Sequence, residues 1–138
     1  MNVDWIIPCR YVEIHENLAT MIGAGIDTLT PSALPAGVQV TTAVRLTGLP
    51  AELEAGLKHT TRTVVRGPDG EIVSEVEGEF EVEGHGPPLD LQQDWLQGFV
   101  VNLAVAFDAD VPGTYKIEHF VDASSAVVAI HVHPDDEA

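Results

Sequence analysis

The chain has 138 residues, and its 22 aspartates and glutamates outnumber its six lysines and arginines, giving a formal net charge of −16 at neutral pH. Such a charge excludes nucleic acid as a favoured partner, because an acidic surface repels the phosphate backbone. A chain of this length is expected to form one domain, and no apolar stretch reaches the roughly 18 residues of a membrane span. Cys9 has no second cysteine to pair with, and no signal peptide precedes it, so we expect a cytoplasmic protein.

The first expected element is a hairpin formed by residues 5–14 and 18–28, with Glu16 and Asn17 in the loop. Its register is set by the alternation of apolar residues. The expected buried pairs are Tyr11 with Ile22, Cys9 with Ala24, and Ile7 with Ile26. On the other face Gly23 and Gly25 would lie opposite Arg10 and Pro8, where the missing side chains indicate a bulge or a close backbone approach.

Residues 30–37 are too rich in proline and glycine for a regular element, and a strand is expected over residues 38–47. Its alternation predicts one buried face. The expected buried residues are Val38, Val40, Thr42, Val44 and Leu46. Residues 50–56 are then a connection with a helical turn near Glu52.

A second hairpin is expected for residues 57–66 and 71–83, around the turn sequence Gly-Pro-Asp-Gly at 67–70. Strict alternation places Glu75, Glu77, Glu79, Glu81 and Glu83 on a solvated face and Ser74, Val76, Gly78, Phe80 and Val82 on the opposite one. A four-residue loop pairs basic with acidic residues: Arg66 with Glu71, Arg62 with Glu75, and Lys58 with Glu79. A three-residue loop with a glycine bulge is the alternative, but without a compensating bulge it mixes the two faces, so we expect the first register.

Residues 84–88 interrupt the sheet, and residues 89–95 are expected to form a short helical turn. Residues 99–107 are almost continuously apolar except for Asn102. This pattern is typical of a central strand covered on both faces or of a strand near an oligomer contact, with a helix as the alternative.

The last expected hairpin joins residues 114–122 to residues 125–133. Its expected inner residues are Tyr115, Ile117, His119, Val121, Val128, Ile130 and Val132. Residues 1–133 then form the folded domain, and residues 134–138 form an acidic, flexible tail.

His131 and His133 are the candidate metal ligands, because two histidines spaced two apart on a strand lie on one face, with Lys116 expected opposite His131. A zinc site needs three or four protein ligands, and the pattern supplies two. The competing interpretation is a pair of surface histidines. A divalent cation on the glutamate face is a second candidate. Same-face residues lie roughly 7 Å apart, which is too far for neighbouring carboxylates to share one ion without further ligands, so a solvated surface is the competing interpretation.

His59 and His119 are expected on apolar faces, as core histidines with satisfied hydrogen bonds. Trp5 and Trp95 are interpreted as packing anchors, with the lining of a ligand cavity as the alternative. No phosphate-binding loop, nucleophile elbow or paired cysteine motif occurs. We therefore expect no cofactor and no enzymatic activity.

Several segments resemble a family of short bacterial proteins catalogued as a domain of unknown function. They are N-L-A-T-M-I-G-A-G-I-D-T-L-T at 17–30, V-R-L-T-G at 44–48, G-P-D-G-E-I-V at 67–73, N-L-A-V-A-F at 102–107 and P-G-T-Y-K-I-E-H-F-V-D at 112–122. The shared motifs are turns and core patterns, so the resemblance implies a β-sandwich and carries no catalytic residue. The chain departs from the family pattern at Glu16-Asn17 and at Ser124-Ser125.

The sequence thus predicts an all-β fold, a single antiparallel β-sandwich of about eight strands with an immunoglobulin-like or C2-like architecture. The expected function is a non-catalytic binding or assembly module that acts through a protein partner or self-association. The alternative is a metal-binding or small-ligand-binding protein that uses His131 and His133.

Overall fold

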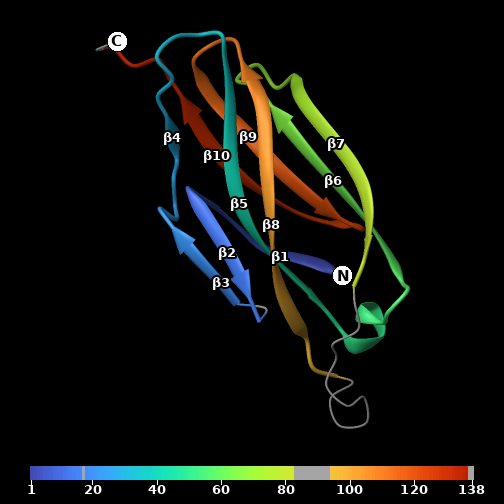
Figure 1. The fold of residues 1–138 in the computed structure, drawn as a ribbon. Coiled ribbons are helices and arrows are strands. Elements are labelled where there is room, and N and C mark those ends of the chain that lie inside the picture. Colours follow the sequence, from blue (N-terminus) through green and yellow to red (C-terminus); the bar gives the residue numbers. More distant parts are fainter. Residues whose placement is uncertain (17, 83–93, 137–138) are drawn as a thin grey trace.

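The computed structural model describes residues 1–16, 18–82 and 94–136, and these residues form an all-β fold with one short 3-10 helix, η1 (Figure 1). The strands are β1 (Asn2–Cys9), β2 (Tyr11–His15), β3 (Leu18–Ile22), β4 (Thr28–Leu29), β5 (Ala36–Gly48), β6 (Lys58–Arg66), β7 (Ile72–Glu81), β8 (Gln97–Ala109), β9 (Gly113–Val121) and β10 (Ser124–Val132); η1 is Pro50–Leu53. No helix among the described residues is long and apolar enough to cross a membrane. The helical turn expected at residues 89–95 begins outside the described residues.

The strands form three sheets with the orders β1-β5-β8, β4-β10-β9-β6-β7 and β2-β3. Adjacent strands are antiparallel except for the short β4, which runs parallel to β10. The prediction of an all-β fold is confirmed, but the predicted antiparallel sandwich of about eight strands differs from the structure in two respects. Ten strands are described, and one pair is parallel.

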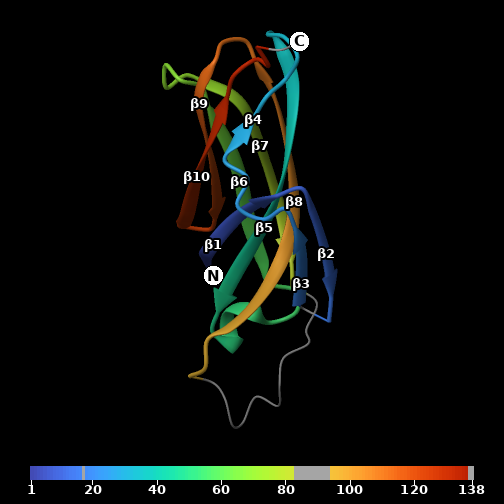
Figure 2. The same ribbon diagram turned by 90° about the vertical axis from the view of Figure 1, so that its left-hand side faces the viewer.

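The three-stranded and five-stranded sheets pack face to face and enclose the core (Figures 1 and 2). Val40 and Phe107 of the first sheet pack with Ile117 and Ile130 of the second, and all four are almost completely buried. The β2-β3 hairpin covers the outer face of the three-stranded sheet, where Cys9, Val12 and Ala43 form a separate buried cluster. Ala43 is buried for this reason, although its face of β5 was expected to be open. The residues predicted for the inner face of β5 are buried, with Val38 only partly so.

The N-terminal hairpin is shorter than predicted. Tyr11 does pair with Ile22, but β1 turns away and pairs with β5, so Cys9 lies opposite Thr41 and not Ala24. Likewise Ile7 lies opposite Ala43 and not Ile26. The predicted inward face is also wrong, because Tyr11 and Ile22 are 51% and 58% exposed while Val12 is buried.

Gly23 and Gly25 lie beside Arg10 and Pro8, as predicted, but only at Gly23 would a side chain meet close neighbours, namely the side chain of Arg10. The amide of Gly25 donates to the carbonyl of Pro8 at 2.8 Å, and a side chain at Gly23 would place its Cβ 2.8 Å from Cγ of Arg10. Both glycines have positive φ angles, which other residues adopt at a cost.

The β6-β7 hairpin uses the bulged turn that the sequence analysis set aside. The amide of Gly67 donates to the carbonyl of Glu71, Gly70 takes a φ of 86°, and Arg66 lies opposite Ile72. A second irregularity after Val65 compensates for the first. Beyond it the register differs from the prediction by two residues, which preserves the two faces. Arg62 is therefore opposite Glu77 and not Glu75.

The β9-β10 hairpin differs from its prediction in the same way. Asp122 and Ala123 form the turn, in place of the predicted residues 123 and 124. Asp122 adopts a φ of 51°, and its carboxylate accepts a hydrogen bond from the amide of Thr60. The predicted inner residues keep their face, and most are buried. Lys116 faces Ala129, so the expected pairing of Lys116 with His131 is wrong.

Residues 99–107 belong to a strand and not to a helix, but β8 is the outermost strand of its sheet in the described chain, so the central position, one of the two predicted, is wrong. The apolar sequence of β8 has a different cause. Phe99 and Leu103 pack against the core between the sheets, while Val100 packs against the cluster beneath the β2-β3 hairpin.

Candidate functional site

His131 and His133 lie on the exposed face at the end of β10, as predicted. Nδ1 of His131 is 2.9 Å from Oγ1 of Thr114, and Nδ1 of His133 donates to the carbonyl of Pro134 at 3.2 Å. No group of three or more histidines, cysteines and acidic residues in the described part of the chain is arranged to hold a metal. The use of this histidine pair by a metal stays a prediction.

His119 is a buried hydrogen-bonded histidine, as predicted, and it joins the two main sheets. Its Nε2 is 3.1 Å from Oγ1 of Thr42 on β5, and its Nδ1 is 2.7 Å from Oγ1 of Thr63 on β6. The Thr42 hydroxyl donates its proton to the carbonyl of Leu103, so its oxygen accepts from Nε2–H. Nδ1 then accepts from the Thr63 hydroxyl, which makes the ring neutral. Burial lowers the pKa of His119 to about 4, consistent with this state.

His59 is equally buried but has the opposite hydrogen-bond requirement. Its Nδ1 is 2.8 Å from Oδ2 of Asp122, and its Nε2 is 2.8 Å from the carbonyl oxygen of Glu52. Both partners offer oxygen atoms that accept, so each ring nitrogen faces a hydrogen-bond acceptor. Burial alone would raise the pKa of Asp122, but the hydrogen bonds from His59 and the Thr60 amide lower it below its usual value.

Glu52 completes this charged cluster. Its carboxylate accepts a hydrogen bond from the amino group of Met1 at 2.6 Å and another from the amide of Leu49 at 2.9 Å. These hydrogen bonds lower the pKa of Glu52. Every polar atom of the two buried histidines therefore has a structural partner. Neither ring is placed as an acid or base facing solvent.

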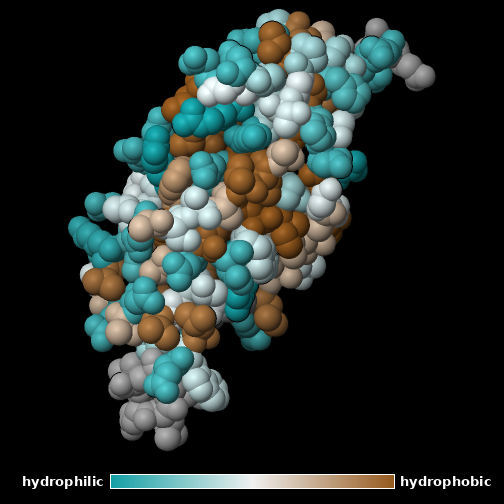
Figure 3. Space-filling view, turned by 180° about the vertical axis from the view of Figure 1, so that it is seen from behind, coloured by the Kyte–Doolittle hydropathy of each residue, from teal (hydrophilic) through white to brown (hydrophobic). Residues whose placement is uncertain are grey.

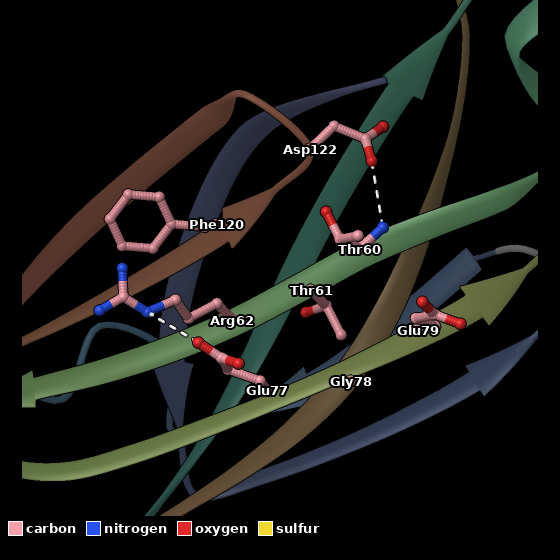
Figure 4. A pocket seen from close by; sticks show the side chains of 8 residues that line it. All are labelled: Thr60, Thr61, Arg62, Glu77, Gly78, Glu79, Phe120 and Asp122. Atoms are coloured by element: carbon pink, nitrogen blue, oxygen red, sulfur yellow. Dashed lines mark hydrogen bonds and ion pairs between the residues drawn. The ribbon is translucent and has the colours of Figure 1, made fainter.

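A hollow lies on the outer face of the five-stranded sheet beside the β9-β10 turn (Figure 4). Its volume is about 510 Å³. The lining residues are Thr60, Thr61, Arg62, Glu77, Gly78, Glu79, Phe120 and Asp122. Three carboxylates thus border the hollow, together with one guanidinium.

Arg62 is held in place at the side of this hollow. Its Nε is 2.7 Å from Oε1 of Glu75 and 3.6 Å from Oε1 of Glu77, and its guanidinium lies 5.4 Å from the ring centre of Phe120. A cation over an aromatic face is favourable. The hollow therefore already accommodates one cationic side chain between carboxylates and an aromatic ring.

The edge strand β7 borders the hollow, and most of its side chains are exposed, although Phe80 packs against the core. Eight of its ten residues are exposed. Among the described residues it pairs only with β6. Val76 lies on the face opposite the glutamates, as predicted, and its side chain is 66% exposed. The opposing sheet has only three strands, so β7 overhangs its edge (Figure 1).

A second hollow, of about 180 Å³, lies between β7 and β8 beneath this overhang. Val76 and Gly78 of β7 line it on one side, and Leu103 and Val105 of β8 line it on the other. It is therefore mainly apolar, in contrast with the acidic hollow on the outer face.

The surface seen from the side of the five-stranded sheet shows hydrophobic side chains gathered in the middle and hydrophilic side chains around them (Figure 3). Val127 on the outer face of β10 is 56% exposed. The tryptophans differ from each other: Trp5 packs under the β2-β3 hairpin as a packing anchor, whereas Trp95 is 62% exposed.

No family model and no curated protein matches the chain. The site must therefore be interpreted from its geometry. The sequence indicated the glutamate face of β7, but its overhang and the hollow behind it were missed, because alternation does not reveal how wide the opposing sheet is.

Proposed function

We propose that the protein is a non-catalytic binding or assembly module, and that a protein partner adds a strand to the edge of β7. The observation that carries the proposal is the exposure of eight of the ten residues in this strand, which in the described chain is paired on one side only. The unpaired amides and carbonyls of an edge strand are a template for another strand. A cytoplasmic location and membership of the bacterial family that the sequence resembles belong to the same proposal.

The absence of catalysis is supported by the hydrogen bonds of the buried histidines. His59 and His119 are the two buried histidines, and each has structural partners on both ring nitrogens. A general base must instead reach a substrate proton.

We further propose an immunoglobulin-like sandwich as the architecture of the domain. In variable-type immunoglobulin domains the strands A, B and E share one sheet, and G, F, C and C′ share the other. The orders β1-β5-β8 and β10-β9-β6-β7 match these two sets. Tyr115 supports the match, because its hydroxyl donates to the carbonyl of Val111 at 2.8 Å, which is the arrangement of a tyrosine corner.

Self-association is the alternative form of assembly, and β8 is the edge that permits it. Its residues 97–107 contain no charged side chain, and β8 ends its sheet in the described residues. Two copies could pair along β8 without like-charge repulsion. Sedimentation over a range of concentrations tests this, and a dimer that Ala104→Lys dissociates would support it.

Strand addition at β7 is tested by amide hydrogen exchange. Peptide binders are selected from a random display library on the purified protein, and exchange is measured with and without each binder. Because alternate amides of an edge strand point away from its neighbour, a bound strand protects every second amide of β7. Binders that protect other regions and leave β7 unchanged would contradict the proposal.

A further inference from the structure

The two faces of β7 differ in chemistry. Its outward face carries Glu75, Glu77, Glu79 and Glu81, and its other face carries Ser74, Val76, Gly78 and Phe80. Since a strand has a side-chain period of two, a strand added beside β7 presents alternate side chains to these two faces. The faces of β7 therefore select the composition of the added strand.

The outward face has more negative charge than its neighbours neutralise. Arg62 contacts Glu75 and Glu77, and Lys58 lies 3.9 Å from Glu79, which leaves four carboxylates beside two cations. Among the described residues Glu81 has no ion pair. Opposite charges on directly facing strand positions are stabilising, so an added strand gains from Lys or Arg on this face.

The same charges exclude a second copy of β7 as the occupant. Consider two β7 strands paired antiparallel with Gly78 of one opposite Gly78 of the other, so that their glutamate faces lie on the same side. Glu77 is then opposite Glu79, and Glu75 is opposite Glu81. Like charges directly opposite each other are destabilising. The occupant is therefore a different sequence from β7 itself.

The inner face selects apolar side chains. Val76 is 66% exposed, and it faces a hollow of about 180 Å³ that is also lined by Leu103 and Val105. A strand beside β7 would bring its inward side chains next to Val76, where aliphatic groups lose the most contact with water.

We propose that β7 binds an extended segment of another protein in which Lys or Arg alternates with aliphatic residues. This inference rests on the proposed function, strand addition at β7, and adds the chemistry of the partner. The cationic side chains lie along the glutamate face, and the aliphatic ones lie beside Val76. Charges on an edge strand also prevent aggregation, but here the exposed Val76 and the hollow beside it supply the second half of a binding site.

The test uses synthetic peptides of equal length with the purified full chain. The first alternates Lys and Val, the second has the same composition with all Lys before all Val, and the third and fourth alternate Glu or Thr with Val. The alternating Lys peptide is expected to bind at least about tenfold more tightly than the block peptide, to protect alternate β7 amides, and to weaken as salt is added.

Two variants with matched charge changes locate the contact. Glu77→Gln with Glu79→Gln should weaken the alternating Lys peptide by roughly 2- to 30-fold, from the loss of two cross-strand pairs. Glu13→Gln on β2 with Asp136→Asn after β10 removes two charges away from β7 and should leave affinity within about twofold. Val76→Glu should also weaken binding, because it places a charge on the inner face.

The outcomes separate this inference from the proposed function. Equal binding of the alternating and block Lys peptides would show attraction to net charge alone and would overturn the inference. Protection of β7 by the Thr or Glu peptide in preference to the Lys peptide would overturn it while supporting strand addition. If no peptide protects β7, both proposals are wrong and its charges serve only to prevent aggregation.

Discussion

Lowering the pH should destabilise the protein through His119. Its pKa falls from 6.5 to about 4 in the folded protein because burial disfavours the charged ring. Below pH 6.5 the unfolded chain takes up a proton that the folded protein does not bind, so stability declines as the pH falls and the loss is complete below about pH 4. The full loss in the free energy of unfolding is about 3 kcal/mol, of which about 2 kcal/mol has already been lost at pH 5.

The assay is urea unfolding between pH 7 and pH 5, compared with His119→Gln. Glutamine keeps a neutral polar group between Thr42 and Thr63 but does not titrate. The carboxylates of Glu52 and Asp122 have lowered pKa values because of their hydrogen bonds, so they stay ionised in this range. The protein should lose about 2 kcal/mol more than the variant. An equal decline in both would refute the neutral, buried state of His119.

Three further results are expected. Arg62→Glu should lower stability by up to about 1 kcal/mol in low salt, because it opposes the Glu75 carboxylate that Arg62 now contacts, and an unchanged urea midpoint would count against this ion pair. Tyr115→Phe should cost about 1–3 kcal/mol, because it leaves a carbonyl without its donor; a cost below about 0.5 kcal/mol would argue against a stabilising tyrosine corner. The purified protein should contain no stoichiometric zinc by elemental analysis; about one zinc per chain, lost on His131→Ala or His133→Ala, would instead support a metal site.

The alternation of side chains predicted the faces of both later hairpins, but their register was wrong by two residues in each case. A period of two fixes which face a residue occupies, and a shift of two leaves that unchanged. The register depends on turn geometry, namely the φ of Asp122 and the paired irregularities around Gly67 to Gly70. These are properties of backbone conformation that the pattern does not contain.

The pairing of β1 could not be predicted for a different reason. Its residues alternate suitably for either β3 or β5, and the chain bends at Arg10, so that the residues before the bend pair with β5. The candidate site was partly visible, since the glutamates of β7 follow directly from the sequence. The hydrogen bond of His59 to Asp122 was not visible, because the two residues lie 63 positions apart in the chain.

The central position of β5 has a consequence for the rate of folding. β5 pairs with β1 and β8, which lie far from it in the chain, as Val44 does with Ile6 and Val101. The three-stranded sheet therefore contains no hairpin, and its formation requires closure of long loops, which is slow. The β6-β7 and β9-β10 hairpins close over short turns. If they form first, substitutions in the core of β5 should mainly accelerate unfolding and leave the folding rate little changed.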